Sequence, residues 1–122
     1  MANEISIGIS IRASKNGGVF KRSETFTDDM TGDAWTAGIV DITASGVQIT
    51  EVQVGTYGWV FLKNLDTGAN YIDIGHTQNT ADDNLCRIYA GESCIFKTNG
   101  LTALWGDSSS GTQVLEYAII EL

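Results

Sequence analysis

The residues best suited to carry chemistry lie in Leu65-Asp66-Thr67-Gly68-Ala69, which follows the apolar segment 57–62. An aspartate in this position can serve as an acid or a base when a second carboxylate lies close to it. Two carboxylates about 3 Å apart share one proton, which separates their pKa values and leaves one as the acid and the other as the base. Asp66 is therefore a candidate catalytic residue.

This segment resembles the catalytic motif of retroviral-type aspartic proteases, in which an apolar strand leads into Asp-Thr-Gly-Ala. The resemblance implies an all-β chain that dimerises to bring two aspartates together, and Leu104-Trp105-Gly106 is similar to a downstream segment of such proteases. Three features depart from the family. Asn64 replaces an apolar residue, Asp66 lies past mid-chain, and positions 66 and 106 are only 40 apart. We favour the alternative of a turn, because Asp, Gly and Asn between apolar strands are typical of turns.

Few other groups could bind a metal or act as a base. Asp82-Asp83-Asn84 offers oxygen atoms of the kind that calcium prefers, but the acidic loops lack the spacing of an EF-hand. His76 is the only histidine, and we expect it on the surface. Cys86 and Cys94 are too few for the usual zinc sites, and we expect free thiols, with pairing between them left open. The sequence thus predicts no metal and no other cofactor.

The composition excludes several classes of partner. The 122 residues include 7 Lys and Arg against 15 Asp and Glu, a net charge of −8, and no Pro. A hydrophobic content of 43% is enough to form a core. The acidic balance argues against nucleic acid, because phosphate contacts need Lys and Arg. No stretch reaches the roughly 20 apolar residues of a membrane helix, and the start lacks signal-peptide features, so we expect no membrane partner and no signal-peptide secretion.

Alternation of apolar and polar residues predicts strands along the whole chain. It is clearest at Ile5, Ile7, Ile9 and Ile11. Further strands are predicted at 19–27, 39–43, 47–54, 57–62, 71–75, 85–89, 93–97, 101–105 and 112–121. No segment has helical periodicity longer than a turn. This pattern predicts a single all-β domain over residues 1–122, a jelly-roll-like antiparallel β-sandwich of about ten short strands.

Three details of this fold can also be predicted. The segment 57–62 is apolar on both faces, which indicates a central strand. Residues 27–36 are rich in Asp, Thr and Gly and predict a loop that holds Trp35. Residues 85–97 predict a hairpin around Ala90-Gly91-Glu92, which would place four residues on one face: Cys86, Ile88, Cys94 and Phe96.

Charge is distributed unevenly along the chain. Residues 1–22 contain four cations and one acid, Glu4, which gives +3 and leaves −11 for the rest of a chain of net charge −8. This asymmetry indicates an oriented contact with an acidic partner surface, and the alternative is that the cations are simply solvated. We predict that residues 1–27 form a basic hairpin that serves as a contact arm, through Arg12, Lys15, Phe20, Lys21 and Arg22.

The second half of the chain has a characteristic order of strands and turns. It runs from Gly58 to Asp66, from Asn70 to Gly75, from Leu85 to Lys97, and from Val114 to Glu121. Over residues 56–121 this order resembles small minor structural proteins of tailed bacteriophages. The resemblance implies a virion component with a jelly-roll-like sandwich, similar to the capsid decoration (cement) proteins of phages, which are small, all-β and oligomeric and attach outside the capsid shell.

We therefore expect a non-enzymatic structural protein, made in the host cytoplasm, that binds the major capsid protein on the capsid exterior. As a homo-dimer or homo-trimer it would stabilise the shell by cross-linking neighbouring subunits. A position at the neck, tail or fibre stays open, as does the choice between dimer and trimer.

Two alternatives remain. The first is a receptor- or carbohydrate-binding module of a phage fibre or tail, in which Trp35 would stack on a sugar beside the loops at 76–84 and 107–111. The second is the aspartic protease that uses Asp66.

Overall fold

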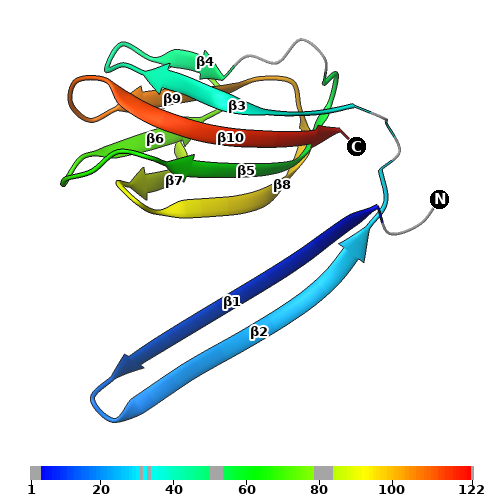
Figure 1. The fold of residues 1–122 in the computed structure, drawn as a ribbon, viewed down its shortest axis with the longest axis vertical. Helices are drawn as coiled ribbons and strands as arrows, with labels where there is room; N and C mark the ends of the chain where they lie inside the picture. Colours follow the sequence, from blue (N-terminus) through cyan, green and yellow to red (C-terminus); the bar gives the residue numbers. More distant parts are fainter. Residues whose placement is uncertain (1–3, 31, 33, 50–53, 79–83, 122) are drawn as a thin grey trace. The chain divides into compact units, whose positions relative to one another are not determined.

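The computed structural model describes residues 4–30, 32, 34–49, 54–78 and 84–121 and shows an all-β protein (Figure 1). Its strands are β1 (Ile5–Lys15), β2 (Gly18–Asp28), β3 (Trp35–Ile42), β4 (Val47–Ile49), β5 (Tyr57–Asn64), β6 (Tyr71–Gly75), β7 (Asn84–Tyr89), β8 (Ser93–Leu101), β9 (Leu104–Ser108) and β10 (Gln113–Glu121). All of their pairings are antiparallel. The described residues contain no helix that could cross a membrane. The predicted all-β fold is confirmed.

The chain divides into two compact units, Met1–Thr31 and Gly32–Leu122. The described part of the first unit is a hairpin of β1 and β2, which we call the arm. Its strands pair without interruption from Ile5 opposite Asp28 to Lys15 opposite Gly18. Asn16 and Gly17 connect them with φ values of 53° and 81°. A two-residue type I′ turn needs positive φ at both positions, and Asn-Gly is the sequence that adopts it most readily.

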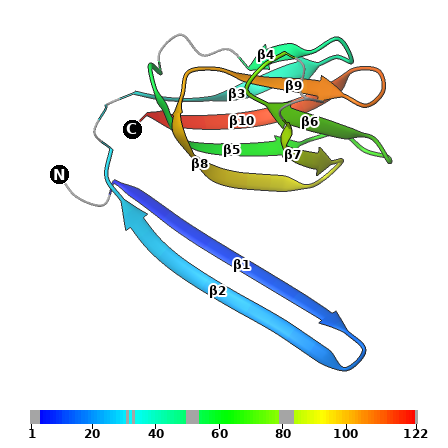
Figure 2. The same ribbon diagram turned by 180° about the vertical axis from the view of Figure 1, so that it is seen from behind.

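The second unit is a β-sandwich of two four-stranded sheets, in the orders β3-β10-β5-β8 and β4-β9-β6-β7 (Figure 2). Its core lies between the sheets and consists of fully or almost fully buried apolar side chains: Ile42, Ile49, Val54, Tyr57, Val60, Leu62, Ile72, Ile74, Ile88, Leu104, Leu115 and Ile119. Both sheets contribute to this cluster, so the predicted sandwich is confirmed. At about 25 cal/mol per Å² of apolar area, burial of these side chains is the main term that stabilises the unit.

The segment predicted as a central strand occupies that position. β5 lies between β10 and β8 in the first sheet. Val60 and Leu62 are completely buried in the core. Trp59 and Phe61 alternate with them and lie on the opposite face of the sheet, which explains why the segment is apolar throughout.

The predicted hairpin over residues 85–97 is wrong. β7 pairs with β6 and β8 pairs with β5, so these consecutive strands belong to different sheets. The turn between them is held by other connections, because the Gly91 amide donates to the Asn64 carbonyl (2.9 Å) and the Ala90 amide to the Asn70 carbonyl (3.1 Å). A hairpin and a connection between two sheets leave the same alternation in the sequence, so periodicity does not separate them.

Two predicted boundaries also need correction. The loop predicted over 27–36 is shorter, because β2 runs to Asp28 and β3 begins at Trp35. Trp35 therefore lies on a strand. In the strand predicted over 47–54, β4 covers Val47–Ile49, and residues 50–53 lie outside the described residues.

Candidate functional site: the arm and the outer face of the sandwich

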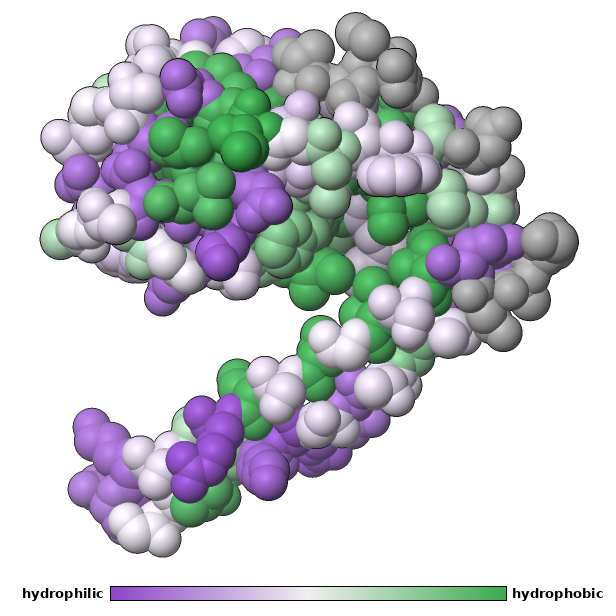
Figure 3. Space-filling view, viewed as in Figure 1, coloured by the Kyte–Doolittle hydropathy of each residue, from purple (hydrophilic) through white to green (hydrophobic). Residues whose placement is uncertain are grey.

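The arm has one apolar face and one polar face. Residues directly opposite each other in an antiparallel pair point to the same side. The register therefore places Ile9 with Glu24, Ile11 with Arg22 and Ala13 with Phe20 on the apolar face, together with Phe26. The side chains of Ile9, Ile11, Phe20 and Phe26 are exposed by 46, 58, 53 and 41%. Apolar residues form a stripe along the arm in Figure 3.

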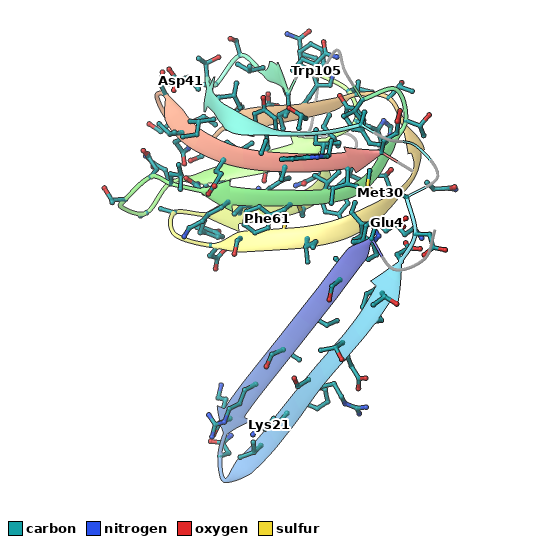
Figure 4. All side chains as sticks on the ribbon, turned by 45° about the vertical axis from the view of Figure 1, so that its right-hand side comes forward. Glu4, Lys21, Met30, Asp41, Phe61 and Trp105 are labelled. Carbon is teal, nitrogen blue, oxygen red and sulfur yellow. The ribbon has the colours of Figure 1, made fainter. Side chains whose placement is uncertain are left out.

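The polar face of the arm has a basic pair near its tip. Arg12 lies directly opposite Lys21, and Lys21 is labelled near the turn in Figure 4. Both side chains are exposed. Like charges directly opposite each other destabilise a strand pair, so an anionic partner that contacts both would remove an unfavourable interaction. Small hydroxyl residues, Ser10, Ser23 and Thr25, share this face.

The register thus separates the five residues predicted as the contact surface. Arg12 and Lys21 lie together on the polar face, whereas Lys15, Phe20 and Arg22 lie on the apolar face. Counting charges along the sequence located the basic segment, but it could not show on which face of the arm each cation lies. The acidic residues of the arm lie closer to its base than the cations do. At the base, the Met30 amide donates to the Glu4 carboxylate (3.3 Å), and Asp28 lies opposite Ile5.

The apolar face also carries one pair of opposite charges. Arg22 Nη1 lies 3.8 Å from Glu24 Oε2, and the two side chains are exposed by 64% and 56%. Ion pairs this exposed contribute little to stability, because water and salt screen them. Both groups therefore remain available to a partner that approaches this face.

The outer face of the sheet β3-β10-β5-β8 carries an apolar patch. The register aligns Trp35 with Ile120 and Trp59, and Ala37 with Ala118 and Phe61. Trp35 and Ile39 are each 65% exposed. Apolar residues gather on this face in Figure 3, and Phe61 is labelled on β5 in Figure 4. Trp35, predicted for sugar stacking, is exposed, and the register places Ile120 and Trp59 beside it.

Asp66 lies in the turn that connects β5 to β6. Its amide donates to Asn64 Oδ1 (3.0 Å), which is the geometry of an Asx turn. Asn64 is completely buried, and its Nδ2 donates to the Ile88 carbonyl (3.1 Å) and to Gln113 Oε1 (3.0 Å). Asn64, which departs from the protease motif, is therefore the residue that orders this turn.

Gln113 extends this buried network to the second sheet. Its Nε2 donates to the Tyr71 carbonyl (2.8 Å) and to Ser108 Oγ (2.7 Å). Asn64 and Gln113 belong to the first sheet, and Tyr71 and Ser108 to the second. The network therefore joins the two sheets at one end of the core. Buried polar groups are tolerated when they are satisfied in this way.

Cys86 and Cys94 lie on the edge strands of the two sheets, and their Sγ atoms are 3.7 Å apart. Both are free thiols and partly buried. The hydrogen bond to Cys94 lowers the pKa of Cys86, against the opposing effects of burial and of Asp73. The same bond, burial and the charge of Cys86 raise the pKa of Cys94. The thiols thus meet across the core, although the strands that carry them do not form the predicted hairpin.

One charged and aromatic cluster was not found from the sequence. Arg87 makes two bonds to the Asp73 carboxylate (2.7 and 3.1 Å) and lies 3.8 Å from the centre of the Tyr71 ring. The Tyr71 and Tyr89 rings are 5.3 Å apart. Hydrogen bonding to Asp73 raises the pKa of Arg87. Each charge of the ion pair is already satisfied within the cluster. The feature that could have revealed this cluster is the pairing of Asp73 with Arg87 and of Tyr71 with Tyr89 across β6 and β7. The sequence alone does not give that register.

The remaining sequence candidates give no assembled site. His76 is exposed at the end of β6. Among the described residues, no three acidic, histidine or cysteine side chains come together as a metal site. Asp82 and Asp83 of the calcium candidate lie outside those residues, whereas Asn84 begins β7.

Fold and surfaces together define the class of this molecule: an antiparallel two-sheet sandwich with a separate two-stranded arm that is apolar on one face and basic at its tip. The chain matches no protein-family model, no curated protein and no solved structure.

Proposed function

We propose that this chain is a non-enzymatic structural protein that binds a protein lattice through its arm, and that the lattice is the outer surface of a phage capsid. The observation that carries the proposal is the arm, which is a separate unit with exposed apolar side chains on one face and the Arg12–Lys21 pair on the other. A soluble monomer gains nothing from such a surface, and exposed apolar patches typically mark interaction sites.

The pairing of the sandwich strands supports the jelly-roll interpretation that accompanies this proposal. β3 pairs with β10, β4 with β9, β5 with β8, and β6 with β7. This is the pairing of one long two-stranded ribbon wound into two sheets. Jelly rolls of eight strands occur in viral capsid domains, although the same fold serves unrelated functions.

The role of each surface follows from its chemistry. Arg12 and Lys21 carry two cations that face the same side, and an acidic patch on the capsid protein would be attracted to them and orient the arm. Contact with several capsid subunits by an oligomer of this chain would cross-link the shell against outward pressure.

The experiment measures binding of the purified chain to phage capsids that lack it, with a charge-reversed variant, R12E/K21E. We expect at least about ten-fold weaker binding and a smaller dependence on salt, because attraction between opposite charges would become repulsion. The matched control is K63E/K97E on the sandwich, which makes the same change in net charge and should bind within about two-fold of the unchanged chain. Equal binding of R12E/K21E and wild type would remove the proposed contact, and absence of binding by the wild type would overturn the function.

A further inference from the structure

Two thiols meet at one edge of the sandwich. Cys86 lies on β7 and Cys94 on β8, and each of these strands is the last in its sheet. The register places Cys86 directly opposite Ile74, which is completely buried in the core. Cys94 lies opposite Leu62 in the same way. Both thiols therefore face inward from opposite sheets, and their Sγ atoms are 3.7 Å apart.

The position of the two thiols also leaves them within reach of solvent. Cys86 and Cys94 pack against the border of the core, and both are only partly buried. Their neighbours Leu85 and Ile95 have side chains that are 47 and 39% exposed. A small dissolved molecule can thus contact the thiols from the edge of the sandwich.

We propose that Cys86 and Cys94 form a reversible disulfide that cross-links the two sheets, with a small-molecule disulfide such as oxidised glutathione as the oxidant. The site lies within the sandwich and goes beyond the lattice contact assigned to the arm. Bonded sulfur atoms are about 2.05 Å apart, so the two Sγ atoms must approach each other by roughly 1.7 Å. Rotation about the Cα–Cβ bonds moves each sulfur without displacing the backbone.

The reaction consists of two thiol–disulfide exchanges. The Cys86 thiol loses its proton to solvent, and the thiolate attacks one sulfur of oxidised glutathione to give a mixed disulfide and one glutathione thiolate. Cys94 then loses its proton to solvent, attacks the Cys86 sulfur and releases the second glutathione thiolate. Both released thiolates take up a proton, so two hydrogens and two electrons pass from the chain to the oxidant.

The surroundings of the pair determine which thiol attacks first. The hydrogen bond with Cys94 lowers the pKa of Cys86, and burial and the charge of Asp73 oppose this effect. The same hydrogen bond, burial and the charge of Cys86 raise the pKa of Cys94. Cys86 therefore has the larger fraction of thiolate and is the attacking residue, and Cys94 resolves the mixed disulfide.

The disulfide would act as a redox-dependent staple of this edge. It closes a loop between two cysteines that are eight positions apart in the sequence. Closing a loop restricts the unfolded chain and so favours the folded one. In a reducing compartment the pair stays a dithiol, and in an oxidising medium it becomes the disulfide.

The test treats the folded full chain with oxidised glutathione, without any capsid, and maps the products by mass spectrometry after an acid quench. We expect the wild type to become two hydrogens lighter, with Cys86 joined to Cys94, and to return to the dithiol in reduced glutathione. The oxidised chain should melt at least about 5 °C above the reduced chain, measured by differential scanning calorimetry. At early times the mixed disulfide should lie on Cys86, and adducts mainly on Cys94 would overturn the order of attack.

Two variants separate the effect of geometry from the presence of two thiols. C94S should stop at a glutathione adduct on Cys86, because the resolving thiol is gone. C94S/I95C keeps two cysteines, but successive residues of a strand point to opposite faces, so the second thiol moves to the outer face of the sheet. This control should collect glutathione adducts and form an internal disulfide at least about ten-fold more slowly than the wild type.

Three outcomes would overturn the inference. The first is a wild type that remains a dithiol in excess oxidised glutathione, whether or not C94S gains an adduct. The second is an internal disulfide that forms as fast in C94S/I95C as in the wild type, and the third is an oxidised chain that melts below the reduced one. None of these measurements involves the arm or a capsid, so their failure is distinguishable from a failure of capsid binding.

Discussion

At the scale of single residues, Cys86 and Cys94 show how two identical side chains acquire different chemistry. Their Sγ atoms lie 3.7 Å apart. When Cys86 ionises, the Cys94 thiol can donate to it, and this hydrogen bond lowers the pKa of Cys86. The pKa of Cys94 rises because its proton is held in that bond and its own charged form would be buried beside a thiolate. The thiolate is the reactive form of cysteine.

We predict that Cys86 is alkylated faster than Cys94, with a pH midpoint below that of an ordinary cysteine. A lowered pKa leaves more thiolate at any pH below the midpoint, so reactivity persists to lower pH and falls only as the pH drops through the lowered value. Mass-spectrometric mapping of iodoacetamide products against pH measures both rates. C94A should raise the midpoint of Cys86, and C94S, which keeps a donor, should raise it less. Equal rates at the two thiols would contradict the assignment.

Residue-level prediction from the sequence was accurate where it needed only local chemistry. The hairpin over residues 1–27 was predicted, and the structure closes it through Asn16 and Gly17, a dipeptide that tolerates positive φ at both positions. The role of Asn64 was not predicted, because its partners Ile88 and Gln113 are distant in sequence and are brought together only by the packing of two sheets.

At the scale of strands, the buried amide network fixes how β5 leaves the first sheet. Asn64 closes β5, orders the Asp66 turn and bonds to Gln113 on β10. Gln113 in turn bonds to the start of β6 and the end of β9. The β5–β6 and β9–β10 connections, which both run from one sheet to the other, therefore depend on the side chains of Asn64 and Gln113.

We predict that N64L destabilises the sandwich by about 2–4 kcal/mol, because it leaves the Ile88 carbonyl and the Gln113 side-chain oxygen buried without their present donor. Chemical denaturation followed by tryptophan fluorescence measures the change. T67A in the adjoining exposed turn is the control and should change the free energy of unfolding by less than about 0.5 kcal/mol. A loss of similar size in both variants would show that the turn itself, and not the network, provides the stability.

The sequence predicted where the strands lie, but it did not predict correctly which strands pair. Alternation located all ten strands approximately, because period two follows from the geometry of one strand with one buried face. It could not tell that β7 and β8 belong to different sheets, since side chains alternate in the same way in both arrangements. It also placed Trp35 in a loop, because the polar residues before it resemble a turn and the edge strand β3 exposes every second residue.

At the scale of the whole molecule, the main buried apolar cluster belongs to one unit alone, although Ile5 and Ile7 of the arm are also buried. Every residue of the buried apolar cluster lies between Ile42 and Ile119. The arm contributes none of them, and the chain divides at Thr31. The sandwich therefore has the interior that an independently stable domain requires.

We predict that a chain of residues 32–122 alone folds cooperatively, with a thermal midpoint within about 5 °C of the full chain, a shift equivalent to roughly 1 kcal/mol for a domain of this size. The same truncation should abolish capsid binding. Differential scanning calorimetry and sedimentation measure these properties. An unfolded or aggregated truncation would mean that the arm completes the fold, and retained capsid binding would move the contact to the sandwich.

The arm has a further consequence that concerns solubility. Each of its two strands has a neighbour on one side only, so each presents a row of backbone amides and carbonyls that another strand could join. The chain has no proline to interrupt those rows. Charged side chains are another device against uncontrolled strand addition, and Arg12, Lys15, Lys21 and Arg22 all lie in the half of the hairpin nearest the turn. The cations of the proposed contact would thus also oppose fibril formation by free chains.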